Sequence, residues 1–298
     1  MKQFFLVHLT DGLCNRMLMV INSLWLGHVY SRNIYFTGFL RDFTKNSTDI
    51  IPIEQIIDVD YLNRLLDELG WNTHIETGVI PENIHVVDPV CDIPEKLDSF
   101  FYTVEDWQNV LAPYTEASHV LIRRPFCAHQ PHNDFWIEHF RFHPKWYEEA
   151  RNCIRKIFPE EMGYKAFHLR LERYSTERES FCDECISDYR RWVGQYLDKD
   201  DFIYVCTGVG KRDGCPSFPN AEAYYQEFRR EFPNSRDSDD TEMSDPSFGG
   251  KECNAIIDYI IATGASTFYY TRGSLFGYFV ATQRQRKCPS VLMQKPSE

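Results

Sequence analysis

The opening of the chain, residues 1–40, constrains the fold more than any other segment. An apolar run at 4–9 leads into a polar turn that contains glycine, TDGLCNR at 10–16. From about 15 to 31 the apolar residues keep helical spacing, and 33–37 is a second apolar run of strand length. A strand, a helix and a second strand in such close succession predict parallel pairing through a crossover, which is the start of a doubly wound α/β domain.

The rest of the chain continues this alternation. In the first half we expect helices near 53–57 and 61–69, strands at 85–87 and 120–123, and a structured loop over 124–144. In the second half the patterns predict helices at 144–158, 185–197, 221–232, 251–263 and 274–283, strands at 165–171, 201–208, 267–271 and 290–293, and a mobile acidic loop at 233–250. We therefore predict an α/β protein with two Rossmann-like, doubly wound domains, 1–150 and 151–298, that face a central cleft.

The composition restricts the function classes. Of 298 residues, 43% are hydrophobic and 15% aromatic, which excludes a disordered chain. The formal net charge of −12 argues against nucleic-acid binding through a basic surface, although an anion can still bind at a local positive site. No apolar run reaches the length of about 18 residues that a membrane span needs, and the run at 4–9 is too short for a signal peptide. We expect a soluble or cytoplasmic protein, unless the sequence is a trimmed part of a secretory-pathway protein.

The ten cysteines are scattered through a chain with ample core, which is unlike a small disulfide scaffold. Cys182 and Cys185 are the one close pair, and no further ligands lie nearby at the spacing of a zinc site. The pair is compatible with a disulfide or with two plain thiols, and we expect no metal. The triplet at 46–48, Asn-Ser-Thr, is a glycosylation sequon, which matters only in a secreted chain.

Residues 166–174, AFHLRLERY, give the strongest indication of a site. In a strand, His168, Arg170 and Glu172 would line one face and the apolar residues between them the other. Burying three ionisable side chains costs free energy unless they form hydrogen bonds or ion pairs with a partner. An arginine here suits a phosphate or a carboxylate, because its guanidinium offers parallel donors and stays charged. The structural alternative is an Arg170–Glu172 pair that only closes the fold, and the segment alone does not decide between the two.

Two glycine-containing turns precede helices, where backbone donors can meet an anion. The first, TDGLCNR, lies at the edge of the sheet where open α/β sheets bind ligands, but it fits neither the dinucleotide fingerprint nor a P-loop. Taken alone it is an ordinary turn capped by Asn15. The second, TRGSLF at 271–276, follows the strand at 267–271. Ahead of that strand, Asp258 lies in an otherwise apolar helix, so it either faces solvent or is recruited to a ligand.

In this order, the three stretches resemble the fucosyltransferase superfamily that includes GDP-fucose protein O-fucosyltransferases and α1,2- and α1,6-fucosyltransferases. The superfamily's Gly-x-x-Asn-Gln/Arg turn matches 12–16, its His-x-Arg strand with a following acid matches 168–172, and its Asp-containing helix, strand and Ser-x-Phe segment match 258–276. Arg16 stands where several branches have glutamine, and 171–173 departs from the ending found in the α1,2/α1,6 group. These departures bear on the identity of the acceptor substrate more than on the identity of the donor substrate.

The resemblance implies a GT-B architecture and an inverting, metal-independent glycosyltransferase. It would move fucose from GDP-fucose, its donor substrate, to a hydroxyl of a glycan or glycoprotein without a cofactor. The N-terminal domain would hold the acceptor and the C-terminal domain the donor. Arg170 would contact the β-phosphate and the leaving oxygen, with His168 supporting the same region. Asp11 would be the general base, with Glu172 as the runner-up that could instead orient Arg170.

The other implied residues would bind the donor. Asn15, between Gly12 and Arg16, would reach across the cleft to the pyrophosphate or fucose. Ser274 and its neighbouring amides would bind phosphate, in a segment completed by Arg272, Gly273 and Leu275. Phe276 would pack near the nucleotide or sugar, and Asp258 would help to place guanine or ribose.

Two other function classes stay open. A non-catalytic nucleotide-sugar or glycan-binding protein could keep the same fold without turnover, although the presence of Arg170 and of candidate acids favours an enzyme. A sulfotransferase-like enzyme is disfavoured, because no P-loop-type phosphate cradle follows the first strand.

Overall fold

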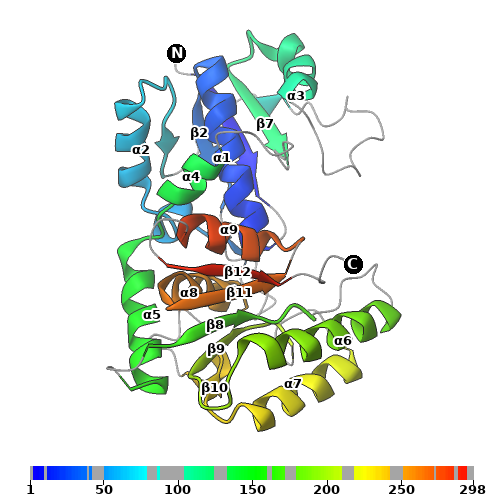
Figure 1. Cartoon of the computed structure of the whole chain (residues 1–298). Helices are drawn as coiled ribbons and strands as arrows, with labels where there is room; N and C mark the ends of the chain where they lie inside the picture. Colours follow the sequence, from blue (N-terminus) through cyan, green and yellow to red (C-terminus); the bar gives the residue numbers. More distant parts are fainter. Residues whose placement is uncertain are drawn as a thin grey trace. The chain divides into compact units, whose positions relative to one another are not determined.

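The protein consists of two Rossmann-like α/β units. The computed structural model describes residues 3–9, 12–38, 40–41, 50–78, 86–87, 104–123, 133–159, 163–171, 179–209, 218–241, 251–271, 273–284 and 288–293. The main division between the two compact units falls between Pro144 and Lys145. Each unit is built on a five-stranded sheet whose neighbouring strands run parallel, which confirms the predicted fold class (Figure 1).

The sheet of the first unit has the order β5-β2-β1-β7-β6. Its strands are β1 (Phe4–His8), β2 (Asn33–Phe36), β5 (Ile75–Glu76), β6 (Val86–Val87) and β7 (His119–Arg123). The helices are α1 (Leu13–Tyr30), α2 (Val59–Glu68), α3 (Val104–Leu111) and α4 (Asn133–His139), and a short antiparallel pair is formed by β3 (Leu40–Arg41) and β4 (Ile50–Ile51). Short 3-10 turns occupy Ile53–Gln55 and Ala112–Tyr114. The strand order reverses at β1, so the turn between β1 and α1 lies at a topological switch point.

A buried arginine follows the C-terminal end of α1, at the end of the helix away from the turn between β1 and α1. Arg32 is 1% exposed, and its Nη2 donates hydrogen bonds to the carbonyl oxygens of Tyr114 (3.0 Å) and Thr115 (2.8 Å). Its guanidinium also lies 5.0 Å from the ring centre of Phe5 on β1. Arg32 therefore joins the end of α1 to the residues before β7, and it has a structural role rather than a role in ligand binding.

The sheet of the second unit has the order β10-β9-β8-β11-β12. Its strands are β8 (Lys165–His168), β9 (Ile203–Cys206), β10 (Ser235–Arg236), β11 (Thr267–Thr271) and β12 (Ser290–Met293). The helices are α5 (Pro144–Ile157), α6 (Glu179–Tyr196), α7 (Pro219–Glu231), α8 (Lys251–Gly264) and α9 (Leu275–Arg284), with a 3-10 turn at Ser238–Asp240. β8 is central, and the order reverses between β8 and β11.

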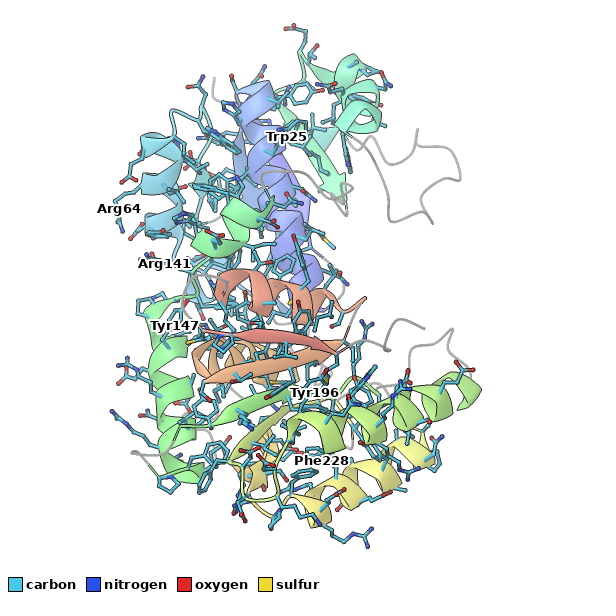
Figure 2. All side chains as sticks on the ribbon, viewed as in Figure 1. Trp25, Arg64, Arg141, Tyr147, Tyr196 and Phe228 are labelled. Carbon is cyan, nitrogen blue, oxygen red and sulfur yellow. The ribbon has the colours of Figure 1, made fainter. Side chains whose placement is uncertain are left out.

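Helices cover both faces of the second sheet. The apolar side chains of β8 and β9 pack with those of α6 and α7 in one buried cluster, in which Phe167 stacks on Phe228 of α7 at 5.5 Å. Figure 2 labels Phe228. On the other face α8 packs against β8 and β9, and α9 packs against β11. Gly277 allows α9 to approach β11, because a Cβ atom at this position would meet Tyr270 at 2.7 Å.

Several boundaries differ from the predictions. The strand predicted at 165–171 is shorter in the structure, because β8 ends at His168. Residues 165–167 pair with both β9 and β11, and His168 pairs with β9 alone. The stretch expected to be a mobile acidic loop begins with β10 and the 3-10 turn, which a capping box of Asp237 and Asp240 stabilises. The predicted structured loop at 124–144 contains α4, and β5 and α3 are additional elements. The side chain of Cys182 is not described, so a disulfide between Cys182 and Cys185, or two plain thiols, stays a prediction.

Candidate anion site at the switch point of the second sheet

The candidate site lies where β8 and β11 end. In open α/β sheets, ligands bind outside the carboxyl ends of the strands at the point where the strand order reverses. In the second unit this edge is formed by His168 and Arg170 after β8, and by Gly273 and Ser274 after β11. Residues 103 positions apart in the sequence meet there, because Nη1 of Arg170 donates a hydrogen bond to the carbonyl oxygen of Gly273 at 3.3 Å.

The side chains around β8 alternate as the sequence predicts. Phe167, Leu169 and Leu171 belong to the buried cluster with α6 and α7. His168, in contrast, contacts Phe276 of α9, and Arg170 contacts Gly273, two residues before that helix. The polar side chains therefore lie on the side of the α8–α9 layer, while the apolar ones anchor the segment in the core.

Arg170 is only partly buried. Its guanidinium carries parallel N–H donors of a geometry that suits a phosphate group. Glu172, the alternative partner considered from the sequence, lies outside the described residues, so the Arg170–Glu172 pair stays a prediction.

His168 is a neutral group at this site. It is 6% exposed, and its ring centre lies 4.9 Å from that of Phe276. Burial, together with the smaller effect of the positive charge of Arg170, lowers the pKa of His168 to about 3. Its Nδ1 is buried without a hydrogen-bond partner in the part of the chain that the structure describes. The positive charge at this edge therefore comes from Arg170 and not from His168.

The segment after β11 forms a capped helix start. Gly273 has a φ of +84°, a conformation that favours glycine. Ser274 is 5% exposed, and its Oγ accepts a hydrogen bond from the amide of Gly277 at 3.3 Å. Leu275 is 37% exposed and begins α9. The helix start thus presents the amides of its first residues and the hydroxyl hydrogen of Ser274 near this edge, an arrangement that favours an anion.

Phe276 of α9 contacts His168 at the polar edge and Tyr259 of α8. Its side chain is partly buried, with His168 on one side and the ring of Tyr259 on the other at 5.9 Å and an interplanar angle of 88°. Phe276 therefore fixes the ring of His168. Whether it also packs against a nucleotide stays a prediction.

The carboxylate of Asp258 is buried inside the second unit and accepts a hydrogen bond there. The residue is 7% exposed, and the hydroxyl of Tyr204 on β9 donates a hydrogen bond to its Oδ1 at 2.6 Å. The thiol of Cys206 donates to the main-chain oxygen of Asp258 at 3.7 Å. Burial, with the nearby charge of Asp258, raises the pKa of Tyr204 well above its usual value, so its hydroxyl remains a donor. Of the two alternatives considered for this carboxylate, solvent exposure is wrong, and a contact with guanine or ribose stays a prediction.

The turn between β1 and α1 carries the other candidate donor contacts. Gly12 is the N-cap of α1, with φ −74° and ψ 170°, and no side chain caps this helix. The suggestion that Asn15 caps the helix is therefore wrong, because α1 begins two residues earlier and Asn15 lies in its first turn, partly exposed. Arg16 is 3% exposed. None of the described atoms would lie within 4 Å of a Cβ atom on Gly12, so packing against the described residues does not require glycine here.

Three candidate residues lie outside the described residues: Asp11, Glu172 and Arg272. The sequon at 46–48 and the side chain of Cys182 do so as well. Among the residues that the structure does describe, no cluster of three or more His, Cys, Asp or Glu side chains is placed to hold a metal ion. Within the same residues, no helix is long and apolar enough to cross a membrane.

Buried residues that hold the polar residues of the site, or the helices around them, carry no local signal in the sequence. Tyr189 of α6 contacts the main chain of both His168 and Arg170 through its hydroxyl, and Tyr204 holds Asp258. Arg284 of α9 is 1% exposed and donates from Nη1 to the carbonyl oxygens of Ala262, Thr263 and Ala265 at the end of α8. No local motif marks these residues, because each acts on a partner that is distant in the sequence.

Comparison with solved structures identifies the class of fold, which is the two-unit, GT-B-like fold of fucosyltransferases. One similar structure is POFUT1 in complex with GDP-fucose, which aligns over 99% of this chain and 98% of its own, with a TM-score of 0.63 and 12% sequence identity. The NodZ fucosyltransferase from Bradyrhizobium aligns over 94% of this chain and 91% of its own, with a TM-score of 0.55 and 9% identity. NodZ α-1,6-fucosyltransferase soaked with GDP-fucose aligns over 95% and 93%, with a TM-score of 0.53 and 9% identity.

These likenesses confirm the fold that the sequence resemblance implied. No protein-family model matches the sequence, and no curated protein is similar enough to match it.

Proposed function

We propose that this protein is a fucosyltransferase that transfers fucose from GDP-fucose to a hydroxyl of a glycan or glycoprotein, with inversion and without a metal ion. The observation that carries this proposal is the hydrogen bond between Arg170 and Gly273, which brings a charged guanidinium and the start of α9 to one switch point. Support also comes from the fold, since structures of the same fold include POFUT1 in complex with GDP-fucose and NodZ α-1,6-fucosyltransferase soaked with GDP-fucose.

The chemistry assigned to this edge is stabilisation of the leaving group. As the bond between fucose and the diphosphate breaks, negative charge grows on the β-phosphate. Arg170 offsets this charge, and the first amides of α9 with the hydroxyl of Ser274 donate further hydrogen bonds. Because these groups are held in place before the reaction, they need little reorganisation in the transition state. His168, which is neutral, contributes shape and hydrogen bonding rather than charge.

The proposed general base is Asp11, with Glu172 as the second candidate. The base removes the proton of the acceptor hydroxyl while that oxygen attacks the anomeric carbon from the side opposite the diphosphate, which inverts the configuration. Gly12, Asn15, Arg16, Asp258, Arg272 and Leu275 remain proposed donor-binding residues.

The test begins with nucleotide binding to the unaltered protein. Thermal unfolding is measured with GDP, UDP, ADP and CMP, and turnover is then followed as GDP release from GDP-fucose with a panel of glycan and glycoprotein acceptors. We expect GDP to raise the melting temperature the most and GDP-fucose to be turned over. A shift with a different nucleotide alone would overturn the donor assignment. Binding of GDP without turnover on any acceptor would instead support a non-catalytic nucleotide-sugar-binding protein.

Substitution of Arg170 tests the mechanism. Arg170→Ala removes a charge contact made in the transition state, so turnover falls by about 100-fold or more. The matched control is Arg190→Ala on α6, since Arg190 is exposed and pairs with Glu227 at 2.6 Å on the surface. The control keeps its turnover because an exposed ion pair contributes little. A folded Arg170→Ala protein as active as the Arg190→Ala protein would refute the role of Arg170.

A further inference from the structure

The backbone just beyond β8 loses its neighbour on one side. The pairing of β8 with β11 ends at Phe167 and Tyr269, whereas the pairing with β9 continues to His168 and Cys206. One more hydrogen bond follows on the β9 side, from the amide of Leu169 to the carbonyl oxygen of Cys206 at 3.1 Å. The strands β8 and β11 thus separate at the switch point.

This separation leaves two main-chain groups in need of partners. In a parallel sheet, the N–H and C=O groups of successive residues point alternately to the two neighbouring strands. The amides of Lys165 and Leu169 both donate toward the β9 side. The carbonyl of His168 and the amide of Arg170 therefore face the β11 side. A strand residue opposite Leu169 would donate to the first and accept from the second, and without it buried polar groups would be unsatisfied.

The hydroxyl of Tyr189 makes both of these bonds. Its Oη accepts a hydrogen bond from the amide of Arg170 at 3.0 Å and donates one to the carbonyl oxygen of His168 at 3.3 Å. Tyr189 is 2% exposed, and its ring packs against Phe167 and Trp192 at 5.8 and 5.5 Å. A rigid, buried side chain of α6 thus takes the place of the missing strand.

We propose that Tyr189 is a positioning residue for the transfer reaction. It keeps the main chain of residues 168–170 in the strand geometry after β11 has separated, and it thereby fixes the point from which Arg170 projects. The other end of Arg170 is held by the carbonyl of Gly273. The positioning role rests on the proposed function, whereas the support of the main chain does not depend on it.

The variant that tests this inference is Tyr189→Phe, which keeps the ring and removes only the hydroxyl. Its matched control is Tyr164→Phe, at the other end of β8, because the hydroxyl of Tyr164 donates to the main-chain oxygen of Ile261 at 2.9 Å. Each substitution removes one buried hydroxyl bonded to the main chain. Tyr189→Phe loses two main-chain hydrogen bonds and Tyr164→Phe loses one, so Tyr189→Phe should lower the melting temperature more. Both variants are therefore assayed well below their melting temperatures, so that a difference in activity reports position and not stability.

We expect Tyr189→Phe to lower kcat for GDP-fucose turnover by about tenfold while KM for the donor changes less than about threefold, because small displacements of a catalytic group affect the transition state most. Tyr164→Phe keeps the kcat of the unaltered protein. If the two variants have the same kcat, the positioning role is refuted.

Hydrogen exchange at the amide of Arg170 separates this inference from the proposed function. In Tyr189→Phe this amide loses its acceptor, so its exchange is faster by about tenfold or more, whereas Tyr164→Phe leaves it unchanged. Unaltered protein without any GDP-fucose turnover would overturn the proposed function alone. Unchanged exchange at Arg170 in Tyr189→Phe would overturn the inference even in an active enzyme.

Discussion

The neutral state of His168 predicts how the stability of the protein depends on pH. The pKa of His168 is lowered to about 3 in the folded protein, from a usual value of about 6.5 in an unfolded chain. The unfolded chain therefore takes up the proton first as the pH falls. The stability contributed by the neutral imidazole is fully present above pH 6.5 and is lost as the pH falls from about 6.5 toward about 3.

The expected magnitude follows from these two values. Between pH 7.5 and pH 5.0 the unfolded state gains about 2 kcal/mol relative to the folded state through this one histidine. Because pH 5.0 lies well above the folded pKa, the result depends mainly on the unfolded value. The variant His168→Gln has no such group, so its free energy of unfolding should fall by about 2 kcal/mol less over the same interval.

The assay is urea unfolding at both pH values, monitored by fluorescence. The protein is kept at a low-micromolar concentration to limit aggregation, because the sequence pI of about 5.3 is close to the lower pH. His74→Gln is the control for the loss of a histidine as such, since His74 lies at the surface beside Asp67. Subtracting the change in unfolding free energy of the unaltered protein between the two pH values from that of each variant cancels the titration of the carboxylates. If His168→Gln and the unaltered protein lose the same free energy between pH 7.5 and 5.0, His168 is not buried in the neutral form.

Two further predictions concern the support of the site. Arg284→Met leaves the last carbonyls of α8 without donors, so the free energy of unfolding should fall by about 3–5 kcal/mol, and a melting temperature equal to that of the unaltered protein would contradict this role. Gly277→Ala should destabilise by about 1–3 kcal/mol because its Cβ would lie 2.7 Å from Tyr270. The control Gly194→Ala, in an exposed part of α6 with no atom within 4 Å, should stabilise by about 0.5–1 kcal/mol, and thermal unfolding that ranks the two variants in the opposite order would refute the packing argument.

The sequence predicts the long elements of this fold well, because their patterns are local. The apolar spacing over 15–31 and 251–263 corresponds to α1 and α8 within a few residues at each end. The short strand β6 was predicted at 85–87. The strands β5 and β10 have two residues each, and pairing with distant strands defines them rather than their own composition. The 3-10 turn at Ser238–Asp240 did have a local signal, since Asp237 and Asp240 have the spacing of a capping box.

The polar residues of the site could be predicted from the sequence, whereas the buried residues that hold them in place could not. Arg170 and Gly273 were both chosen from the sequence, and the structure brings them within hydrogen-bond distance. The neutral state of His168 depends on burial against Phe276, which a sequence pattern does not reveal. The role of Tyr189 depends on where β11 leaves β8, and this is a property of the whole sheet.

The bonding and stacking contacts described above for this edge, from His168 to Phe276, join residues of a single stretch of about 110 positions. If that stretch stabilises a leaving diphosphate, this part of the chemistry is encoded separately from the proposed base at Asp11 and the proposed donor contacts at 12–16. Substitutions near the N-terminus would then change the acceptor or the base without altering the groups that offset the charge of the diphosphate.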